Sequence, residues 1–226
     1  ISEKEEALNY IQNHNTELLQ EVNKAVTLYE KYYIQNKMML IEFIILVCSL
    51  ISLIITWLIV NNIIKKSETD QLTGIKKRAV LVRELENEID RYYRYNQKLG
   101  LIMFDIDHFK RVNDEFGHDT GDKVLSELAR IVDNLIRKSD IFARWGGEEF
   151  MILVPYTELK SIEILAERLR KEISQNQFEE VGKITCSFGV TEFNQNDTID
   201  SFIQRVDKAL YKAKSEGRNC VISLAK

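Results

Sequence analysis

The segment that decides the fold reads LIMFDID and occupies residues 101–107. It begins with four apolar residues, as a buried strand does, and it ends in two carboxylates. Because side chains alternate along an extended chain, we expect Asp105 and Asp107 to point to the same side. Carboxylates at the end of a buried strand suit Mg²⁺, which binds one or two carboxylates together with substrate phosphates. Taken alone the pair is a weak indicator, since two surface acids that begin a loop give the same pattern.

Helical and strand patterns alternate on both sides of this segment. Helices are predicted over residues 79–96, 119–137, 158–175 and 199–216, and strands over residues 100–105, 141–144, 150–154, 184–190 and about 220–224. From residue 100 to residue 190 the order is β-α-β-β-α-β, which is the split βαβ arrangement of ferredoxin-like folds. We therefore predict an α/β (α+β) domain with a central, mainly antiparallel sheet and helices on one face.

A second acidic pair, Glu148 and Glu149, follows two glycines in a turn between two predicted strands. Gly146 and Gly147 permit close approach of the backbone to a bulky ligand. If the strand that ends at Asp105 pairs with this hairpin, the acidic ends meet. Asp105 and Glu148 would then hold a cation, and Glu149 would be left as a candidate base. A solvated hairpin tip is the alternative.

Two further groups of polar residues suit a nucleotide. The loop over residues 113–122 carries Asn, His and Asp side chains, which can read a base edge, because an Asp accepts from two N–H donors such as those of guanine. Helix capping, by Asp119 for example, is the alternative. Lys214, in the last turn of the final helix, and Arg218 just beyond it suit a phosphate clamp. For these two cations the alternative is a favourable interaction with the helix dipole.

The composition excludes collagen-like, low-complexity and strongly basic nucleic-acid-binding classes. The 226 residues include only nine Gly and one Pro, and 31 Lys and Arg against 35 Asp and Glu give a formal charge of −4. The apolar residues are unevenly spread, because Glu42 is the only charged residue from Met38 to Ile64. That run exceeds the roughly 20 residues that a helix needs to cross a bilayer. We therefore predict a transmembrane helix over residues 38–64, in preference to a buried core helix or a cleaved signal peptide.

The flanks of this run suggest its orientation. Lys65 and Lys66 follow it directly, so the positive-inside rule places the C-terminal side in the cytoplasm. Residues 1–37 show a heptad seam and are predicted to form an extracytoplasmic helical segment, either a bundle or a coiled coil. Residues 65–69 contain no Pro or Gly and are predicted to be a connector helix that leads to a domain over residues 70–226. The chain begins with Ile1, which is compatible with a missing upstream portion.

Six motifs in order closely resemble those of the GGDEF-domain diguanylate cyclases, from about Thr69 to the end of the chain. They are DxLTG (70–74), FDIDHFK (104–110), NDxxGHxxGD (113–122), GGEEF (146–150), SFGV (187–190) and AKxxGRN (213–219). The resemblance implies a palm-type nucleotide cyclase domain that joins two GTP molecules into cyclic di-GMP with loss of two pyrophosphates. It also implies a homodimer in which each domain presents one GTP to the other.

The resemblance also implies a role for each matching residue. Mg²⁺ or Mn²⁺ would lie on Asp105, Glu148 and the carbonyl of Ile106. The remaining roles are guanine and ribose binding by Asn113, His118 and Asp122, close approach of the substrate at Gly146 and Gly147, triphosphate binding by Lys214 and Arg218, and catalysis by Glu149 and Lys110. Phosphoryl transfer rests on positioning and charge neutralisation, which such a set provides. Whether Glu148, Glu149 or a metal-bound water removes the proton from the attacking 3′-hydroxyl stays open.

A product-binding site is implied as well. Arg137 and Asp140 match the RxxD motif of the family, five residues before Gly146, and Arg168 matches its supplementary arginine. Cyclic di-GMP is therefore expected to be an inhibitor as well as the product, with a surface ion pair as the alternative. The whole sequence indicates a signal-regulated cyclase in contact with lipid in the inner, cytoplasmic membrane, with its catalytic domain in the cytoplasm and no nucleic-acid partner. A nonenzymatic cyclic di-GMP receptor or scaffold is the alternative.

Overall fold

The structure is a computed structural model, and it describes residues 2–225. Within the first helix, the side chains at positions 2, 9, 11–13 and 62–67 are not part of that description. Predictions that rest on them, including Lys65, Lys66 and part of the heptad seam, lie outside the described residues. The chain divides into two compact units, Ile1–Asn62 and Ile63–Lys226, which are described separately.

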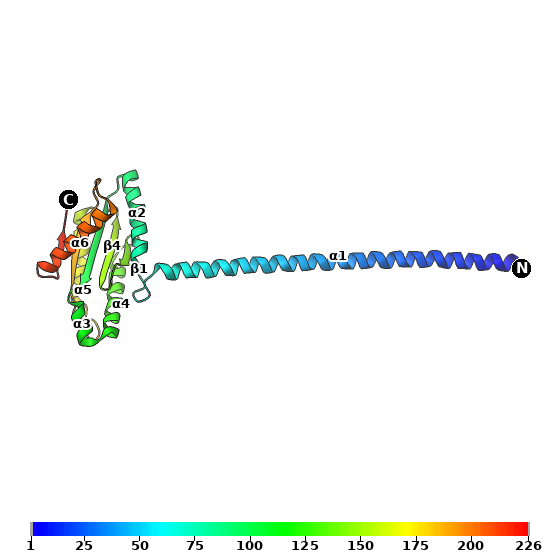
Figure 1. Cartoon of the computed structure of the whole chain (residues 1–226), viewed down its shortest axis with the longest axis horizontal. Helices are drawn as coiled ribbons and strands as arrows, with labels where there is room; N and C mark the ends of the chain where they lie inside the picture. Colours follow the sequence, from blue (N-terminus) through cyan, green and yellow to red (C-terminus); the bar gives the residue numbers. More distant parts are fainter. Residues whose placement is uncertain (1, 226) are drawn as a thin grey trace. The chain divides into compact units, whose positions relative to one another are not determined.

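Helix α1 (Ser2–Glu68) is a single helix of 67 residues (Figure 1). Most of the described apolar side chains between residues 38 and 61 are exposed, with Phe43 65% and Trp57 64% exposed. Among the described residues, the stretch His14–Asn61 is long and apolar enough to cross a membrane by length and composition. A core helix of a soluble domain would bury such side chains.

The globular unit is built on one sheet of six strands in the order β1-β3-β4-β2-β5-β6. The strands are β1 (Lys76–Lys77), β2 (Leu99–Ile106), β3 (Ile141–Arg144), β4 (Glu149–Pro155), β5 (Cys186–Glu192) and β6 (Val221–Ser223). The three inner pairings are antiparallel, whereas β1 pairs with β3 and β6 with β5 in parallel. The prediction of a mainly antiparallel sheet is therefore confirmed, with parallel strands at both edges.

Helices cover both faces of this sheet (Figure 1). They are α2 (Arg78–Tyr95), α3 (Phe109–Phe116), α4 (His118–Leu135), α5 (Leu159–Gln175) and α6 (Ile199–Ser215). One core contains side chains from α3, α4 and α5, and the second contains side chains from α2 and α6. The prediction of helices on one face is thus wrong for the whole domain, although it holds for the split βαβ unit. Every residue of β2 is buried, which requires a cover on each side of the strand.

Side chains of β2 alternate between the two cores. Ile102, Phe104 and Ile106 enter the core of α4 and α5, whereas Leu101 and Met103 enter the core of α2 and α6. This alternation continues to the end of the strand and places Asp105 on the side of α6. The position of the acidic residue therefore follows from the same period that packs the two cores.

Helix α3 was predicted as loop and is a correction to the sequence analysis. It occupies residues 109–116, so that Asn113 lies on a helix, and Gly117 with φ +86° separates it from α4. Two turns of helix contain too few apolar residues to show a helical period in the sequence. The two-residue strand β1 escaped prediction for the same reason.

Gly189 explains how α6 approaches the sheet so closely. A Cβ at this position would lie 2.5 Å from the carbonyl oxygen of Val206 and closer still to the amide nitrogen of Leu210. Both atoms belong to the backbone of α6, which cannot move aside as a flexible side chain does. A side chain at position 189 would therefore force α6 away from β5.

We expect Gly189→Ala to destabilise the globular unit by about 2 kcal/mol or more, because the helix must shift or strain. Chemical denaturation of the full chain measures the change. Gly147→Ala is the matched control, since a Cβ there meets no atom within 4 Å and should change stability by less than about 0.5 kcal/mol. Equal stability of the Gly189→Ala variant and the control would contradict the packing argument.

Candidate functional site

Asp105 lies at the centre of the candidate site, at the end of β2. It is 5% exposed, and in the β2–β4 register it is the direct partner of Glu149. Two like charges opposite each other on antiparallel strands destabilise the pairing. Lys214 of α6 reaches this point, and its Nζ lies 2.9 Å from Oδ2 of Asp105. The predicted meeting of acidic strand ends is therefore present in the structure, with a lysine as counter-charge.

The electrostatics of Asp105 reflect this crowding. Burial raises the pKa of the carboxyl, the hydrogen bond and charge of Lys214 lower it, and the negative charges of Glu148 and Glu149 raise it, with a net result of about 6. A buried carboxylate with two more acids in its field stabilises any additional cation that enters. Such a site favours an ion with a higher charge than a lysine ammonium.

The side chains of Asp105, Glu148, Glu149 and Lys214 are called the acidic corner below. A divalent cation fits the donor chemistry of the acidic corner. Asp105 and Glu148 offer carboxylate oxygens, and Ile106, the last residue of β2, offers a carbonyl. Hard oxygen donors of this kind suit Mg²⁺ and Mn²⁺. Within the described residues, no three His, Cys, Asp or Glu side chains converge closely enough to form a ready metal cluster. The ion-paired Lys214 occupies Asp105 instead, so the set fits a metal that is completed by substrate oxygens and water.

The turn between β3 and β4, residues 145–148, is called the acidic turn below. The amide groups of Trp145 and Gly146 donate to the carbonyl of Glu149 at 2.8 and 3.2 Å, which closes the hairpin. A Cβ on Gly146 would lie 2.6 Å from Oε2 of Glu149, so this carboxylate packs directly over the glycine. Gly147 faces open space and leaves the approach to the turn clear. The two glycines therefore have different roles, one in placing Glu149 and one in access.

Arg144 supports the acidic turn and was missed by the sequence analysis. Its Nε and Nη2 donate to the carbonyl of Gly147 at 3.1 and 2.8 Å, and its Nη1 donates to Asp70 at 3.1 Å. Burial acts to raise the pKa of Asp70, but hydrogen bonds from Thr73 and Arg144 outweigh it and lower the pKa. The contact joins residues 74 positions apart, and its one sequence signal was the presence of Asp70 in the DxLTG motif.

The predicted base-binding residues lie on two consecutive helices. Asn113 is on α3, and His118 and Asp122 are one turn apart at the start of α4. A Cβ on Gly121 would lie 3.1 Å from Cγ of Asn113 and would collide with its Oδ1. The absence of a side chain at position 121 therefore lets the amide of Asn113 pack against the first turns of α4. The structure thus places Asn113 at the junction of α3 and α4, where His118 and Asp122 begin α4.

Asp107 has a structural role that differs from that of Asp105. Its Oδ1 accepts from the hydroxyl of Ser187 at 2.6 Å, and its Oδ2 accepts from Thr185 at 2.7 Å and from the amide of Asn219 at 3.0 Å. The last bond fixes the segment directly after Arg218 to the end of β2. Arg218, directly before Asn219, has a positive φ of 62°, a conformation that is uncommon for a residue other than glycine.

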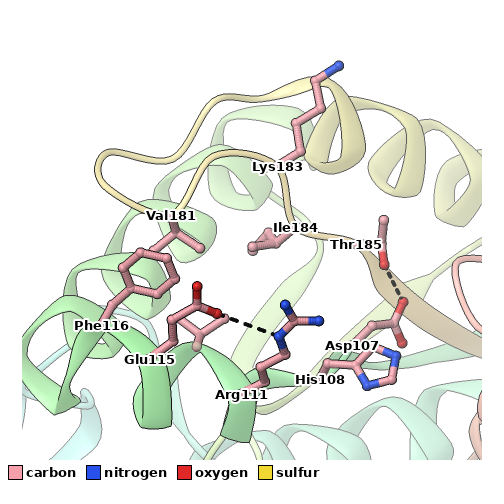
Figure 2. A pocket seen from close by; sticks show the side chains of 10 residues that line it. Asp107, His108, Arg111, Glu115, Phe116, Val181, Lys183, Ile184 and Thr185 are labelled. Carbon is pink, nitrogen blue, oxygen red and sulfur yellow. Dashed lines mark hydrogen bonds and ion pairs between the residues drawn. The ribbon is translucent and has the colours of Figure 1, made fainter.

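A pocket of about 430 Å³ lies between α3 and residues 181–185, and Asp107 is part of its lining. Figure 2 shows the hydrogen bond between Thr185 and Asp107 at one end of it, and Arg111, between Asp107 and Glu115, pointing toward Glu115 at 3.5 Å. The predicted Lys110 is the next residue before Arg111 and lies in the first turn of α3, exposed to solvent. The helix therefore begins immediately beside the acidic corner.

The predicted product-binding residues line a second pocket, of about 370 Å³. The carboxylate of Asp140 accepts from the amide of Arg137 at 2.9 Å, and Arg168 donates to the carbonyl of Leu135 at 2.6 Å. Burial raises the pKa of Asp140, and the amide and charge of Arg137 oppose this rise. The structure therefore brings Arg137 and Asp140, from the turn between α4 and β3, together with Arg168 of α5 in the lining of one pocket.

The globular unit is similar to known proteins over most of its length. A family model described as "Diguanylate cyclase, GGDEF domain" matches residues 67–220. The chain is 46% identical over 158 residues to "Diguanylate cyclase DgcP" of Pseudomonas aeruginosa, a match that covers 69% of this chain and 24% of that protein. The chain spans less than half the length of this and other curated relatives that it matches.

Two solved structures are similar over most of their length. The coiled coil and GGDEF domain of DgcB from Caulobacter crescentus, in complex with c-di-GMP, matches with a TM-score of 0.76 and 28% identity, covering 79% of this chain and 97% of that one. Diguanylate cyclase SiaD in complex with its activator SiaC, from Pseudomonas aeruginosa, matches with a TM-score of 0.69 and 32% identity, covering 97% and 84% respectively.

We expect Asp105→Asn to stabilise the metal-free chain at pH 7.5 by up to about 2 kcal/mol, with allowance for solvent screening. The carboxyl has a higher pKa in the folded state than the ordinary 3.8, so its ionisation costs stability above about pH 6. The advantage of the variant should shrink as the pH falls from 6 toward 4. Thermal melting at several pH values measures this, with the exposed Asp122→Asn as control. A lower melting temperature for Asp105→Asn at pH 7.5 would contradict the pKa argument.

Proposed function

Because the chain belongs to the family of GGDEF-domain diguanylate cyclases, we propose that it joins two molecules of GTP into cyclic di-GMP and releases two pyrophosphates. The observation that carries the proposal is the acidic corner, where Asp105 faces Glu149 and pairs with Lys214. The names of its relatives support the same activity. The reaction requires in-line positioning and neutralisation of phosphate charge, which this corner is built to provide.

The residues that would hold Mg²⁺ or Mn²⁺ are Asp105, Glu148 and the carbonyl of Ile106. When bound, the ion would supply positive charge to the phosphate oxygens of GTP. Lys214, which neutralises Asp105 in the structure, would with Arg218 and Lys110 bind the rest of the triphosphate. The anchoring of Asn219 to Asp107 would hold Arg218 close to the end of β2.

The remaining roles concern the base and the attacking hydroxyl. Asn113, His118 and Asp122 would bind guanine and ribose at the junction of α3 and α4. Glu149, packed over Gly146, would accept the proton of the 3′-hydroxyl of one GTP. The hydroxyl oxygen would attack the α-phosphorus of the second GTP at the same time. The bond from that phosphorus to the bridging oxygen breaks, and pyrophosphate leaves. A second, identical step closes the ring.

A dimer and a membrane belong to the same proposal. Each domain has one corner of this type, so two domains must face each other for two GTP molecules to react. Residues 1–37 of α1 would form the extracytoplasmic segment, residues 38–64 would cross the inner membrane in contact with lipid, and residues 65–69 would connect to the cytoplasmic domain over residues 70–226. The exposed apolar surface of the long helix supports the membrane assignment.

Purified full-length chain in detergent should convert GTP into cyclic di-GMP and pyrophosphate when Mg²⁺ is present. Glu148→Ala should lower turnover by at least about 100-fold, because the acidic turn then lacks its metal ligand. Chromatographic analysis of the nucleotides measures both, with the exposed Glu86→Ala as control. Full activity of Glu148→Ala would remove the metal assignment. A dimeric, metal-loaded chain that binds cyclic di-GMP without making it would instead support a receptor.

The same proposal includes inhibition by the product. The pocket of Arg137, Asp140 and Arg168 offers two guanidinium groups and a carboxylate, which suit the phosphates and guanine edges of cyclic di-GMP. The RxxD turn is preformed, since Asp140 already accepts the amide of Arg137. Binding there would therefore require little rearrangement of the backbone.

We expect Arg137→Ala to weaken binding of cyclic di-GMP by about 10-fold to 100-fold, which is the usual cost of losing a hydrogen bond to a charged group. Turnover of this variant should continue at product concentrations that stop the wild-type chain. Titration calorimetry and the nucleotide assay measure the two effects. Lys138→Ala, which alters the neighbouring exposed side chain, should behave as wild type. Retained wild-type activity at saturating product would contradict the inhibition proposal and leave the cyclase proposal intact.

A further inference from the structure

The acidic turn is held by the first residues of the globular unit as well as by its own strands. These residues, 70–78, are called the opening segment. One contact is the bridge through Arg144, which bonds to Gly147 in the turn and to Asp70 in the opening segment. The side chains of Arg144 and Asp70 are only 19% and 22% exposed, so water screens this bridge weakly.

The second contact comes from the other end of the opening segment. The guanidinium carbon of Arg78 lies 4.0 Å from the centroid of the Trp145 ring, which is within the range of a strong cation–π interaction. Arg78 is the first residue of α2, and Trp145 is the first residue of the acidic turn. Within the described part of the chain, Arg78 takes part in no ion pair, so Trp145 is its main electrostatic partner.

The orientation of Trp145 is connected directly to the catalytic carboxylates. Its amide donates to the carbonyl of Glu149 at 2.8 Å. The carboxylate of Glu149 packs against Gly146, the next residue. The indole also packs against the core that α2 and α6 share. A shift of the indole therefore moves the backbone from which Glu148 and Glu149 project.

From this geometry we infer that Arg78 is a positioning residue, which sets the acidic turn through Trp145. The inference rests on the proposed cyclase function. Arg78 does not itself reach the acidic corner, and its effect is on turnover through the placement of Glu148 and Glu149. Tryptophan has the strongest cation–π attraction of the aromatic side chains, so this chain holds the turn more firmly than tyrosine would.

The two contacts together connect the opening segment to two positions of the acidic turn, Trp145 and Gly147. Asp70 acts on Gly147 through Arg144, and Arg78 acts on Trp145. Since the segment is nine residues long and bonded at its first and last residue, a displacement of it is passed to the turn. A movement of the opening segment would therefore change the positions of Glu148 and Glu149.

We expect Arg78→Ala to lower kcat by about 3-fold to 30-fold with the KM for GTP changed less than about 2-fold, because substrate contacts stay intact. Trp145→Leu should have the same effect, and the double variant should be no worse than either single one. Trp145→Tyr should keep most of the turnover. The full chain in detergent is used throughout, and melting temperatures are recorded.

Arg94→Ala is the matched control, since Arg94 lies on the same helix over another ring, Tyr95, at 5.9 Å. It should leave kcat unchanged. A kcat of Arg78→Ala within 2-fold of wild type would overturn the inference. Additive losses in the double variant would do the same, as would a fall in kcat that is matched by Arg94→Ala.

Fluorescence separates this inference from the proposed function. Trp57 and Trp145 are the two tryptophans of the chain, so Trp57→Phe leaves Trp145 as the single emitter. In that background, Arg78→Ala should shift the emission of Trp145 to longer wavelength, because the ring loses its cover. This result holds whether or not the chain makes cyclic di-GMP. An unchanged spectrum would overturn the contact, whereas an inactive wild-type chain with the expected shift would count against the cyclase proposal alone.

Discussion

Asp105 and Glu149 face each other across adjacent strands, and their like charges oppose the pairing of β2 with β4. The buried apolar residues that precede Asp105 on β2 offset this repulsion, because the two cores hold the strands in register from both faces. Lys214 supplies the counter-charge from α6. The fold thus keeps two acids together that would separate in the absence of the surrounding packing, and the divalent cation that we propose at this site would relieve their repulsion.

The reach of Lys214 depends on a glycine in the neighbouring strand, opposite Met103 of β2. Gly189 in β5 lets the backbone of α6 lie against the sheet, and the helix then runs toward the end of β2. Asp107 continues this connection, because its carboxylate joins Ser187 and Thr185 to the amide of Asn219. Helix α6 therefore both packs in the second core and places Lys214 in the site.

The sequence predicted most of the fold because its inner strands and longer helices have clear periods. The run from Leu101 to Asp105 and the turn at Gly146 predicted the central pairings, and the acidic ends meet as that pairing requires. Helix α3 and strand β1 are too short to produce a period, and the helices on the second face lie outside the split βαβ unit. Arg144 and Arg78 were missed because their partners, Asp70 and Trp145, are 74 and 67 positions away, and contacts of that kind leave no local pattern.

The order of the elements along the chain has a consequence for biosynthesis. Helix α6 and strand β6 follow the other elements of the domain in the sequence, and the segment from α6 to β6 contains Lys214, Arg218 and Asn219, whose amide bonds to Asp107. A nascent chain that has completed β5 therefore has its acidic corner without its lysine, and the edge of β5 without β6. Such a chain, if released early by the ribosome, would carry the acids of the site but neither of its C-terminal cations. The site can therefore be assembled only after residues 199–223 have been synthesised.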